Sequence, residues 1–480
     1  MERAPEKLPL GKLILFALGQ MGWSLASYGV SNLLVYFYMP PETATAAIFP
    51  AFLFQGAFVG FLTITGVVNF GSRLFDAVTN PIIASWSDRS PARMGRRRFF
   101  MAISAAPFAL FAVLVFIPLQ HFHAQPTVAQ SWLNIVWLVG TILLFYFFFV
   151  MYNAPFNALI AELGHNPRER LIISTVISVT WALGFAVGNF VYEFQGLFEK
   201  SGMSSVSAFQ TVEIIFGVVS FILMLLPVLF IDERRYAAYS VSHESTGQAL
   251  TSALRNSNFF RFLVSELLYF ICQTVIQMGV VYYVVTLLGL EKELTSFLMI
   301  FMFLLSFAFY PLVTWSSLKL EKKRVLMVGF ALLAVLFLCF ALMGVLPIRG
   351  IVFAYVTIAI AALPMAIFGI VPNAIVADIA EADGIETGNF KAGMFFGIRT
   401  FETNLGTSIA NGLFPSLLLL GKSVENPFGI RMTAIVSVAI ALLGMFVFVF
   451  YDERKVLRSL AKKEKLTGAS AREAGAAGTA

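Results

Sequence analysis

Long apolar runs constrain this chain more than any other feature of its sequence. An α-helix needs about 20 apolar residues to cross the hydrocarbon core of a bilayer, and the 480-residue chain holds twelve such runs in two groups of six. The first group lies near 12–38, 52–86, 99–119, 131–154, 170–194 and 208–231, and the second near 258–288, 294–317, 324–346, 350–377, 391–420 and 429–451. The pattern predicts an all-α membrane protein with twelve transmembrane helices in two six-helix bundles.

The composition supports this class and excludes others. Hydrophobic residues make up 59% of the chain and charged residues 12%, whereas a soluble protein has about 45–50% and about 25%. The net charge of +6 does not indicate a nucleic-acid partner, because the basic residues lie in short loops between apolar runs. Placing both termini in the cytoplasm puts 26 of the 33 Lys and Arg residues on that side, as the positive-inside rule requires.

A polar stretch between the two groups of runs divides the chain. The segment DERRYAAYSVSHESTGQALTSALRNSN reads as a central linker. We therefore expect an N-terminal bundle over 1–231, a cytoplasmic linker over 232–257 and a C-terminal bundle over 258–451. The low-complexity tail over 452–480 is expected to be disordered and cytoplasmic.

The chain carries no pattern of a known catalytic centre. All four histidines fall in loops, and neither HExxH, GxSxG nor a Walker motif occurs. The two cysteines, Cys272 and Cys339, lie in apolar runs without metal-binding spacing. Transport driven directly by ATP is therefore not expected, and neither is an enzyme; a membrane-embedded enzyme is only a distant alternative.

The second apolar run carries ionisable groups at membrane depth. The stretch NFGSRLFDAVTN places four polar residues at i, i+4, i+7 and i+11, on one helical face. These are Asn69, Arg73, Asp76 and Asn80. A charge at bilayer depth costs about 2.5–3.5 kcal/mol even on the mildest scale, so such residues are candidate functional groups. The alternative is a structural pair in which Arg73 and Asp76 only neutralise each other.

Other runs add polar groups that could face the same space. The eleventh run carries Arg399 and Glu402 at i and i+3, and the seventh aligns Glu266 with two glutamines. The amides concerned in the fourth and seventh runs are Asn153, Asn157, Gln273 and Gln277. Each amide could instead form a hydrogen bond between helices. Together the polar residues predict a hydrated, hydrogen-bonding substrate cavity between the two bundles.

Four segments resemble the glycoside–pentoside–hexuronide:cation symporters, a branch of the major facilitator superfamily. They are LLVYFY, RLFDAVTNPIIASWSDRSPARMGRRR, YNAPFNALIAELGHNPRERLIIST and PNAIVADIAEADGIETGNFKAGMFFG. These segments lie in both halves, so the resemblance covers the whole membrane region. It implies the major facilitator fold and cation-coupled transport by alternating access.

The resemblance also implies a cation site on the second helix. In sugar-carrying members, two acidic residues four apart bind Na⁺, Li⁺ or H⁺; the matching positions here are Asp76 and Asn80, so one carboxylate remains. The acidic residue of the family's fourth helix matches Asn153. A monovalent cation at Asp76 would then use oxygens of Thr79, Asn80 and Asn153. The alternative is that Asp76 holds a proton.

The positions that bind sugar in the family are altered here. The first-helix acidic residue matches Ser24, the fifth-helix arginine matches Ser178, and the eleventh-helix lysine matches Asn404. Arg399, five residues before Asn404, is a candidate replacement for the lysine. A sugar or glycoside remains the expected substrate. An amphiphile such as a lysophospholipid is the alternative, because the sugar-binding groups are largely missing.

The loop after the second helix resembles the family's gating loop. The resemblance implies that Asp88 and Arg89 hold the cytoplasmic face shut in the outward-facing state, with Arg170 and Asp378 as corresponding latch residues. The alternative is that these are solvated charges that only fix topology. We expect a monomeric, multi-pass cell-membrane protein without a cofactor, whose only bound ion is a coupling Na⁺ or H⁺ and whose other partners are its solute and membrane lipid.

Overall fold

The computed structural model of the chain describes residues 6–42, 48–88, 90–122, 124–164, 167–237, 254–387 and 392–460. Among these residues, ten helices are long and apolar enough to cross a membrane. Two more, α3 (Ile64–Asp88) and α15 (Ala392–Leu417), have 25 and 26 residues and carry the charged positions predicted above. At a rise of 1.5 Å per residue, each exceeds the roughly 30 Å of a hydrocarbon core.

Each predicted apolar run contains a helix. The remaining elements of the first group are α1 (Leu10–Tyr28), η1 (Gly29–Leu33), α2 (Leu34–Tyr38), β1 (Ala57–Val59), β2 (Leu62–Thr63), α4 (Arg96–Leu114), α5 (Val128–Leu163), α6 (Pro167–Asn189), α7 (Val191–Lys200), α8 (Ser205–Phe230) and α9 (Glu233–Tyr236). Those of the second group are α11 (Ser257–Tyr282), η2 (Tyr283–Leu287), α12 (Glu293–Lys319), α13 (Lys322–Leu342), α14 (Gly350–Thr387), η3 (Leu418–Leu420) and α16 (Phe428–Val449).

The second run is shorter as a helix than its hydropathy suggested. Residues 57–63 form a two-stranded antiparallel hairpin, and α3 begins only at Ile64. The hairpin turns at Gly60, whose φ of +59° lies in the left-handed region that glycine adopts most easily. Apolar content alone therefore did not distinguish the hairpin from the helix that follows it.

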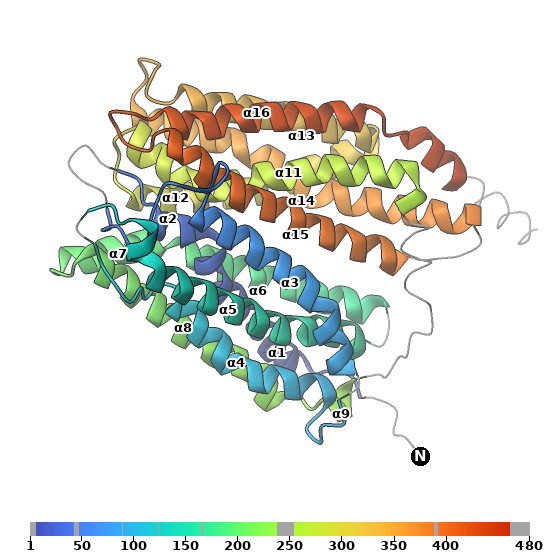
Figure 1. The fold of residues 1–480 in the computed structure, drawn as a ribbon. Helices are drawn as coiled ribbons and strands as arrows, with labels where there is room; N and C mark the ends of the chain where they lie inside the picture. Colours follow the sequence, from blue (N-terminus) through green and yellow to red (C-terminus); the bar gives the residue numbers. More distant parts are fainter. Residues whose placement is uncertain are drawn as a thin grey trace, which may run out of the picture. The chain divides into compact units, whose positions relative to one another are not determined.

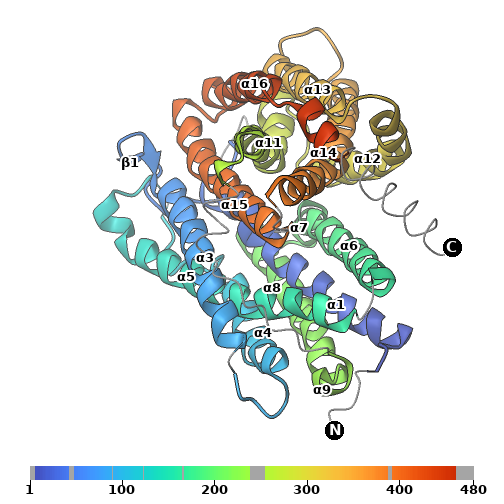
Figure 2. The same ribbon diagram turned by 90° about the vertical axis from the view of Figure 1, so that its right-hand side faces the viewer.

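The chain divides into two compact units. Unit 1 comprises 1–242, 275–300 and 408–433, and unit 2 comprises 243–274, 301–407 and 434–480. Within unit 1, α1 packs on α6 and α8, and α4 packs on α5 and α8, as Figure 1 shows. Within unit 2, α11 lies among α13, α14, α15 and α16 when the helices are viewed along their axes (Figure 2). This central place explains why α11 has the largest buried share of the membrane-crossing helices.

An aromatic core fills one end of unit 1. Phe37 of α2 stacks on Phe52 and Phe209, with ring centroids 4.8 and 5.1 Å apart. Phe49 and Phe116 lie against the same ring at 5.1 and 5.5 Å. Offset and edge-to-face contacts of this kind add to the stabilisation from burial alone. Packing in this core accounts for several of the 51 phenylalanines of the chain.

The same unit joins segments that are far apart in sequence. Lys292 donates to both carboxylate oxygens of Glu199 at 2.6 Å. The ammonium of Lys422 donates to Gln55 Oε1 at 2.7 Å and lies 3.5 Å from Glu42 Oε1. Burial lowers the pKa of Lys422, and the Glu42 carboxylate opposes that shift. Two lysines from the second half of the sequence therefore bind side chains of the first half.

Hydroxyl groups join the same segments. Tyr282 donates to the Met39 carbonyl at 2.7 Å, and Ser296 donates to the Asn189 carbonyl at 2.6 Å. Gly66 lies so close to the Gly412 carbonyl that an added Cβ would come within 2.9 Å of it. This end of unit 1 is consequently a closed, hydrogen-bonded contact. We call it the closed end.

A short internal repeat caps one helix in each half of the sequence. Glu233 of FIDERR accepts from the backbone N–H groups of Arg97 and Arg98 at 3.0 and 2.9 Å. Glu453 of FYDERK accepts from those of Lys322 and Lys323 at 2.9 Å each. The carboxylates thus satisfy free N–H groups at the starts of α4 and α13. The two halves share this contact although their sequences differ around it.

The cap predicts a measurable loss of stability. Glu453→Ala should lower the free energy of unfolding by about 1–2 kcal/mol, because it leaves two N–H groups of α13 without their acceptor. Glu425→Ala, at an exposed loop position, is the matched control. Thermal unfolding of the purified protein measures both, and equal melting temperatures would contradict the capping role.

Candidate functional site

The predicted polar face of α3 is present in unit 1. Asn69 and Asp76 are each 2% exposed. Within the described residues, Asp76 Oδ1 and Asn69 Nδ2 have no hydrogen-bond partner. A buried polar atom without a partner is costly, and a carboxylate oxygen in this state is a ready ligand for a cation or a proton. Asp76 is therefore a candidate ion ligand of this unit.

Arg73 does not neutralise Asp76 by direct contact. Its Nη2 donates to Ser31 Oγ of η1 at 2.7 Å, and its guanidinium lies 5.0 Å from the ring centroid of Tyr146 on α5. Across the described part of the chain, no ion pair joins Arg73 to Asp76. Arg73 thus links three helices, while Asp76, one turn away, keeps an unpartnered oxygen.

Two of the other predicted cation ligands, Thr79 and Asn153, have local bonds. The Thr79 hydroxyl donates to the Phe75 carbonyl of its own helix at 2.8 Å. Asn157 donates to Asn153 Oδ1 at 2.8 Å on α5, and Asn80 is half-buried on α3. Lone pairs of these oxygens could still serve a cation, but the contacts described here do not place them around Asp76. The proposed ligand set therefore stays a prediction.

Unit 2 holds a second charged cluster. The guanidinium of Arg399 donates to Glu266 through Nε at 2.9 Å to each oxygen and through Nη2 at 2.6 Å. Its Nη1 donates to Asn373 Oδ1 of α14 at 2.6 Å. Arg399 thereby joins α15 to α11 and α14. The partner of Arg399 is Glu266 on another helix, and not Glu402 on its own.

The remaining predicted cavity residues have varied surroundings. Ser24 is 1% exposed and donates to the carbonyls of Met21 and Trp181, at 3.1 and 3.3 Å, so its hydroxyl already joins α1 to α6. Ser178 is exposed and donates to the Ser174 carbonyl at 2.8 Å. Gln273, Gln277 and Asn404 are half-buried on α11 and α15. Their role as substrate ligands remains a prediction.

The gating residues are only partly described. Arg89 and the side chains of Asp88 and Arg170 lie outside the described parts of the structure. Asp378 on α14 accepts from Lys322 Nζ of α13 at 2.5 Å, an ion pair inside unit 2. The observed partner therefore makes Asp378 a link between neighbouring helices of one unit, and its role as a latch remains a prediction.

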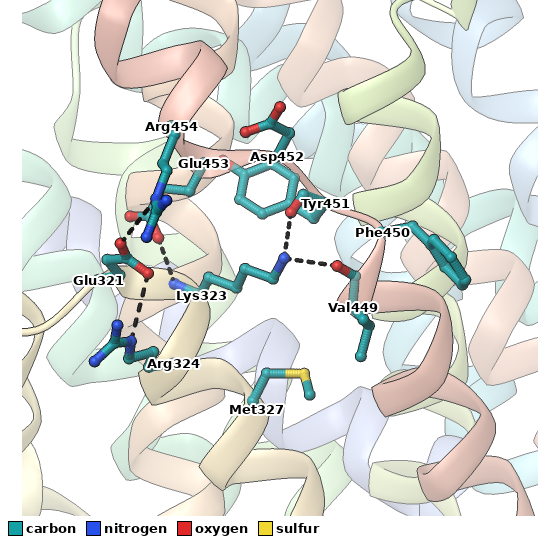
Figure 3. A pocket seen from close by; sticks show the side chains of 10 residues that line it. All are labelled: Glu321, Lys323, Arg324, Met327, Val449, Phe450, Tyr451, Asp452, Glu453 and Arg454. Carbon is teal, nitrogen blue, oxygen red and sulfur yellow. Dashed lines mark hydrogen bonds and ion pairs between the residues drawn. The ribbon is translucent and has the colours of Figure 1, made fainter.

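A hollow at the ends of α13 and α16 could be mistaken for a ligand site. It encloses about 660 Å³ and is drawn in Figure 3. Its cations are engaged within it: Lys323 donates to the carbonyls of Val449 and Tyr451 at 2.6 Å each. The Nε atom of Arg324 lies 3.4 Å from Glu321 Oε2, and that of Arg454 lies 3.5 Å from Glu321 Oε1. We assign this network to helix capping and not to substrate binding.

Sequence reasoning did not find every group of these clusters. Ser31, Tyr146 and Asn373 contact the two arginines but lie on other helices. Nothing in their spacing along the chain links them to Arg73 or Arg399. Only Asn373 had a signal, since it stands in the PNAIVAD segment that resembles the symporter family. Among the described residues, no group of three or more His, Cys, Asp or Glu side chains could hold a metal ion.

Comparisons with known proteins show the family of this chain. The family model for "MFS/sugar transport protein" matches residues 15–455. The glucuronide carrier protein homolog of Escherichia coli is 23% identical over 390 residues, covering 79% of this chain and 82% of that protein. The isoprimeverose transporter of Lactiplantibacillus pentosus is 21% identical over 327 residues, covering 68% of this chain and 63% of that protein.

Solved structures confirm the predicted fold. The nucleoside transporter NupG superposes with a TM-score of 0.65 at 14% identity, covering 92% of this chain and 99% of that one. A bacterial homologue of the human lysosomal transporter Spinster gives 0.61 at 12% identity, covering 94% and 97%. Both are transporters, and at this identity they establish the fold alone.

Fold and sequence together define a secondary transporter of the major facilitator class, a multi-pass membrane protein and not an enzyme. Within that class the chain belongs to the MFS/sugar transport protein family, which contains the glycoside–pentoside–hexuronide:cation symporters, as the four quoted segments predicted.

The Arg399–Glu266 pair predicts a non-additive stability effect. Arg399→Ala should destabilise the purified protein by about 3–5 kcal/mol, because it leaves the 2%-exposed Glu266 buried without its cation. Adding Glu266→Gln should restore a large part of that loss. Thermal unfolding of the single and double variants measures the effect, and purely additive shifts would contradict the pairing.

Proposed function

We propose that this protein is a cation-coupled symporter that moves a sugar or glycoside-type solute across the cell membrane by alternating access. The observation that carries the proposal is Asp76, a buried carboxylate with an unpartnered oxygen in a chain whose family contains cation symporters. The names of its relatives, a glucuronide carrier homolog and an isoprimeverose transporter, favour a sugar-type solute.

The coupling step follows from the cost of the buried charge. Asp76 without a cation is a desolvated anion whose Oδ1 has no hydrogen-bond partner in the described structure. Binding of Na⁺ or H⁺ removes that cost. A solute that binds better to the cation-loaded form must in return strengthen cation binding, because linkage is reciprocal. One carboxylate at this site predicts that one ion binds there per cycle.

Amide side chains on α5 and α11 match a hydroxylated solute. Asn153 and Asn157 already form an amide pair on α5, and the half-buried Gln273 offers both a donor and an acceptor. Amides of this kind pair well with sugar hydroxyls, whereas a lipid chain would require an apolar lining. The relatives' names favour sugars, and a lysophospholipid is the outcome that would overturn this assignment.

We assign the closed end of unit 1 to the outer face, with both chain termini in the cytoplasm. Alternating access then requires that the Lys292–Glu199 and Lys422–Glu42 pairs open once per cycle. The pairs are partly buried, so their opening exposes charge to water. Their contribution to the closed state should therefore be modest and reversible.

The solute class can be tested by ligand-induced stabilisation. We expect sugars or glycosides to raise the melting temperature of the purified protein, with a larger shift in the presence of the coupling ion. The panel includes lysophospholipids, and each ligand is measured with and without Na⁺ and at two pH values. Stabilisation by lysophospholipids alone would contradict the sugar assignment.

Substitution of Asp76 tests the coupling. Asp76→Asn removes the charge with little change in volume. We therefore expect loss of uphill solute accumulation and of the dependence of uptake on the ion gradient. Solute exchange without a gradient should be partly retained. Gradient-driven uptake and counterflow in proteoliposomes measure the two. Uphill accumulation with unchanged ion dependence would contradict a coupling role for Asp76.

The closed end supports a separate prediction. Glu199→Gln should weaken the bond to Lys292 and increase opening of this end. Alkylation of Ser296→Cys, at a position that is now fully buried, should then become several-fold faster in a background without the two native cysteines. Glu193→Gln on the same helix is the control. Equal alkylation rates in both backgrounds would show that the pair does not hold this end shut.

A further inference from the structure

Glu402 is the least satisfied carboxyl of unit 2. It is 6% exposed on α15, and within the described residues neither of its two side-chain oxygens has a hydrogen-bond partner. Glu266 and Arg399 are both close enough to act on it electrostatically. A carboxylate in this position would be a buried charge facing another carboxylate.

The only guanidinium of this cluster is already engaged. Arg399 gives three donor contacts to Glu266 at 2.6–2.9 Å and one to Asn373 at 2.6 Å. Its charge is thereby balanced by Glu266 and not by Glu402. Two carboxyl groups beside one guanidinium leave one negative charge in excess if both are ionised. A buried group in that situation takes up a proton in preference to remaining charged.

We propose that Glu402 is a proton-binding site of unit 2, separate from the cation site at Asp76, and that it gives up and regains this proton during transport. The exchange of the proton during transport rests on the proposed function, whereas the proton-binding site itself does not. A proton fits better than a metal ion, because one oxygen suffices to hold it and no further ligand is required.

The groups that face this carboxyl define how proton loss acts. When the O–H bond of Glu402 breaks, the proton goes to water and the electron pair stays on the carboxylate. Arg399, three residues earlier on α15, is then attracted by Glu402 as well as by Glu266. Tyr269 of α11 lies beside this pair, next to Tyr310 of α12 and Cys272. Proton loss therefore weakens the bond between α15 and α11, and protonation restores it.

The proton itself can be observed without any solute. Infrared difference spectra of the purified protein, recorded during a pH titration, show the carbonyl stretch of a protonated carboxyl group. We expect a component of this band to be lost in Glu402→Gln, whose amide imitates the protonated form. The component should persist in Asp76→Asn and in the exposed control Glu425→Gln. A spectrum that is unchanged in Glu402→Gln would overturn the assignment.

The exchange of the proton during transport has its own readout. The pH profile of counterflow in proteoliposomes should change in Glu402→Gln and keep its wild-type form in Glu425→Gln. An unchanged profile in Glu402→Gln, with the infrared component lost, would overturn the role in transport. If the wild-type protein exchanges no solute of the panel, the proposed function fails, and the infrared result still decides whether Glu402 holds a proton.

Discussion

An ionised side chain inside a membrane must find a partner, and this requirement organises the protein. Two solutions occur within the described structure. Glu266 is paired with Arg399 through contacts of 2.6–2.9 Å, whereas Asp76 and Glu402 retain unpartnered oxygens. The paired carboxylate holds helices together, and the unpaired ones are free to bind ions. The same residue type thus joins helices in one place and, in the function proposed above, binds the coupling ion in another.

The helix packing decides which carboxyl has which surroundings. α11 lies among α13, α14, α15 and α16 (Figure 2), and Arg399 of α15 supplies the cation that pairs with Glu266. Arg73 of α3 is instead drawn to Ser31 and to the ring of Tyr146. Asp76 is left without direct compensation although an arginine stands one turn away. The proposed ion site thus lies where packing directs the neighbouring arginine elsewhere.

The sequence predicted the membrane-spanning elements well. Apolar runs of the required length identify transmembrane helices because the bilayer leaves few alternatives, and every predicted run contains one. The hairpin at 57–63 was not predicted, because its residues are as apolar as those of the helix after it. Polarity at membrane depth also identified Asp76, Arg399 and Glu402 as unusual residues.

Partner identity could not be predicted in the same way. Arg399 and Glu402 stand at i and i+3 on one helix, but the guanidinium binds Glu266, which lies 133 residues away in sequence. Likewise, Ser24 reads as a cavity residue by position, yet its hydroxyl donates to Trp181 of α6. Long side chains choose among neighbours on several helices, and that choice depends on tertiary packing that local spacing does not record.

Thermodynamic linkage between solute and ion tests the central claim most directly. The dissociation constant of the stabilising sugar or glycoside would be measured on the purified protein over a range of Na⁺ concentrations at fixed pH, and over a range of pH at fixed Na⁺. The account predicts that the coupling ion tightens solute binding in the wild-type protein and that Asp76→Asn abolishes this effect. A solute affinity that is independent of both ions, or a dependence that survives Asp76→Asn unchanged, would contradict it.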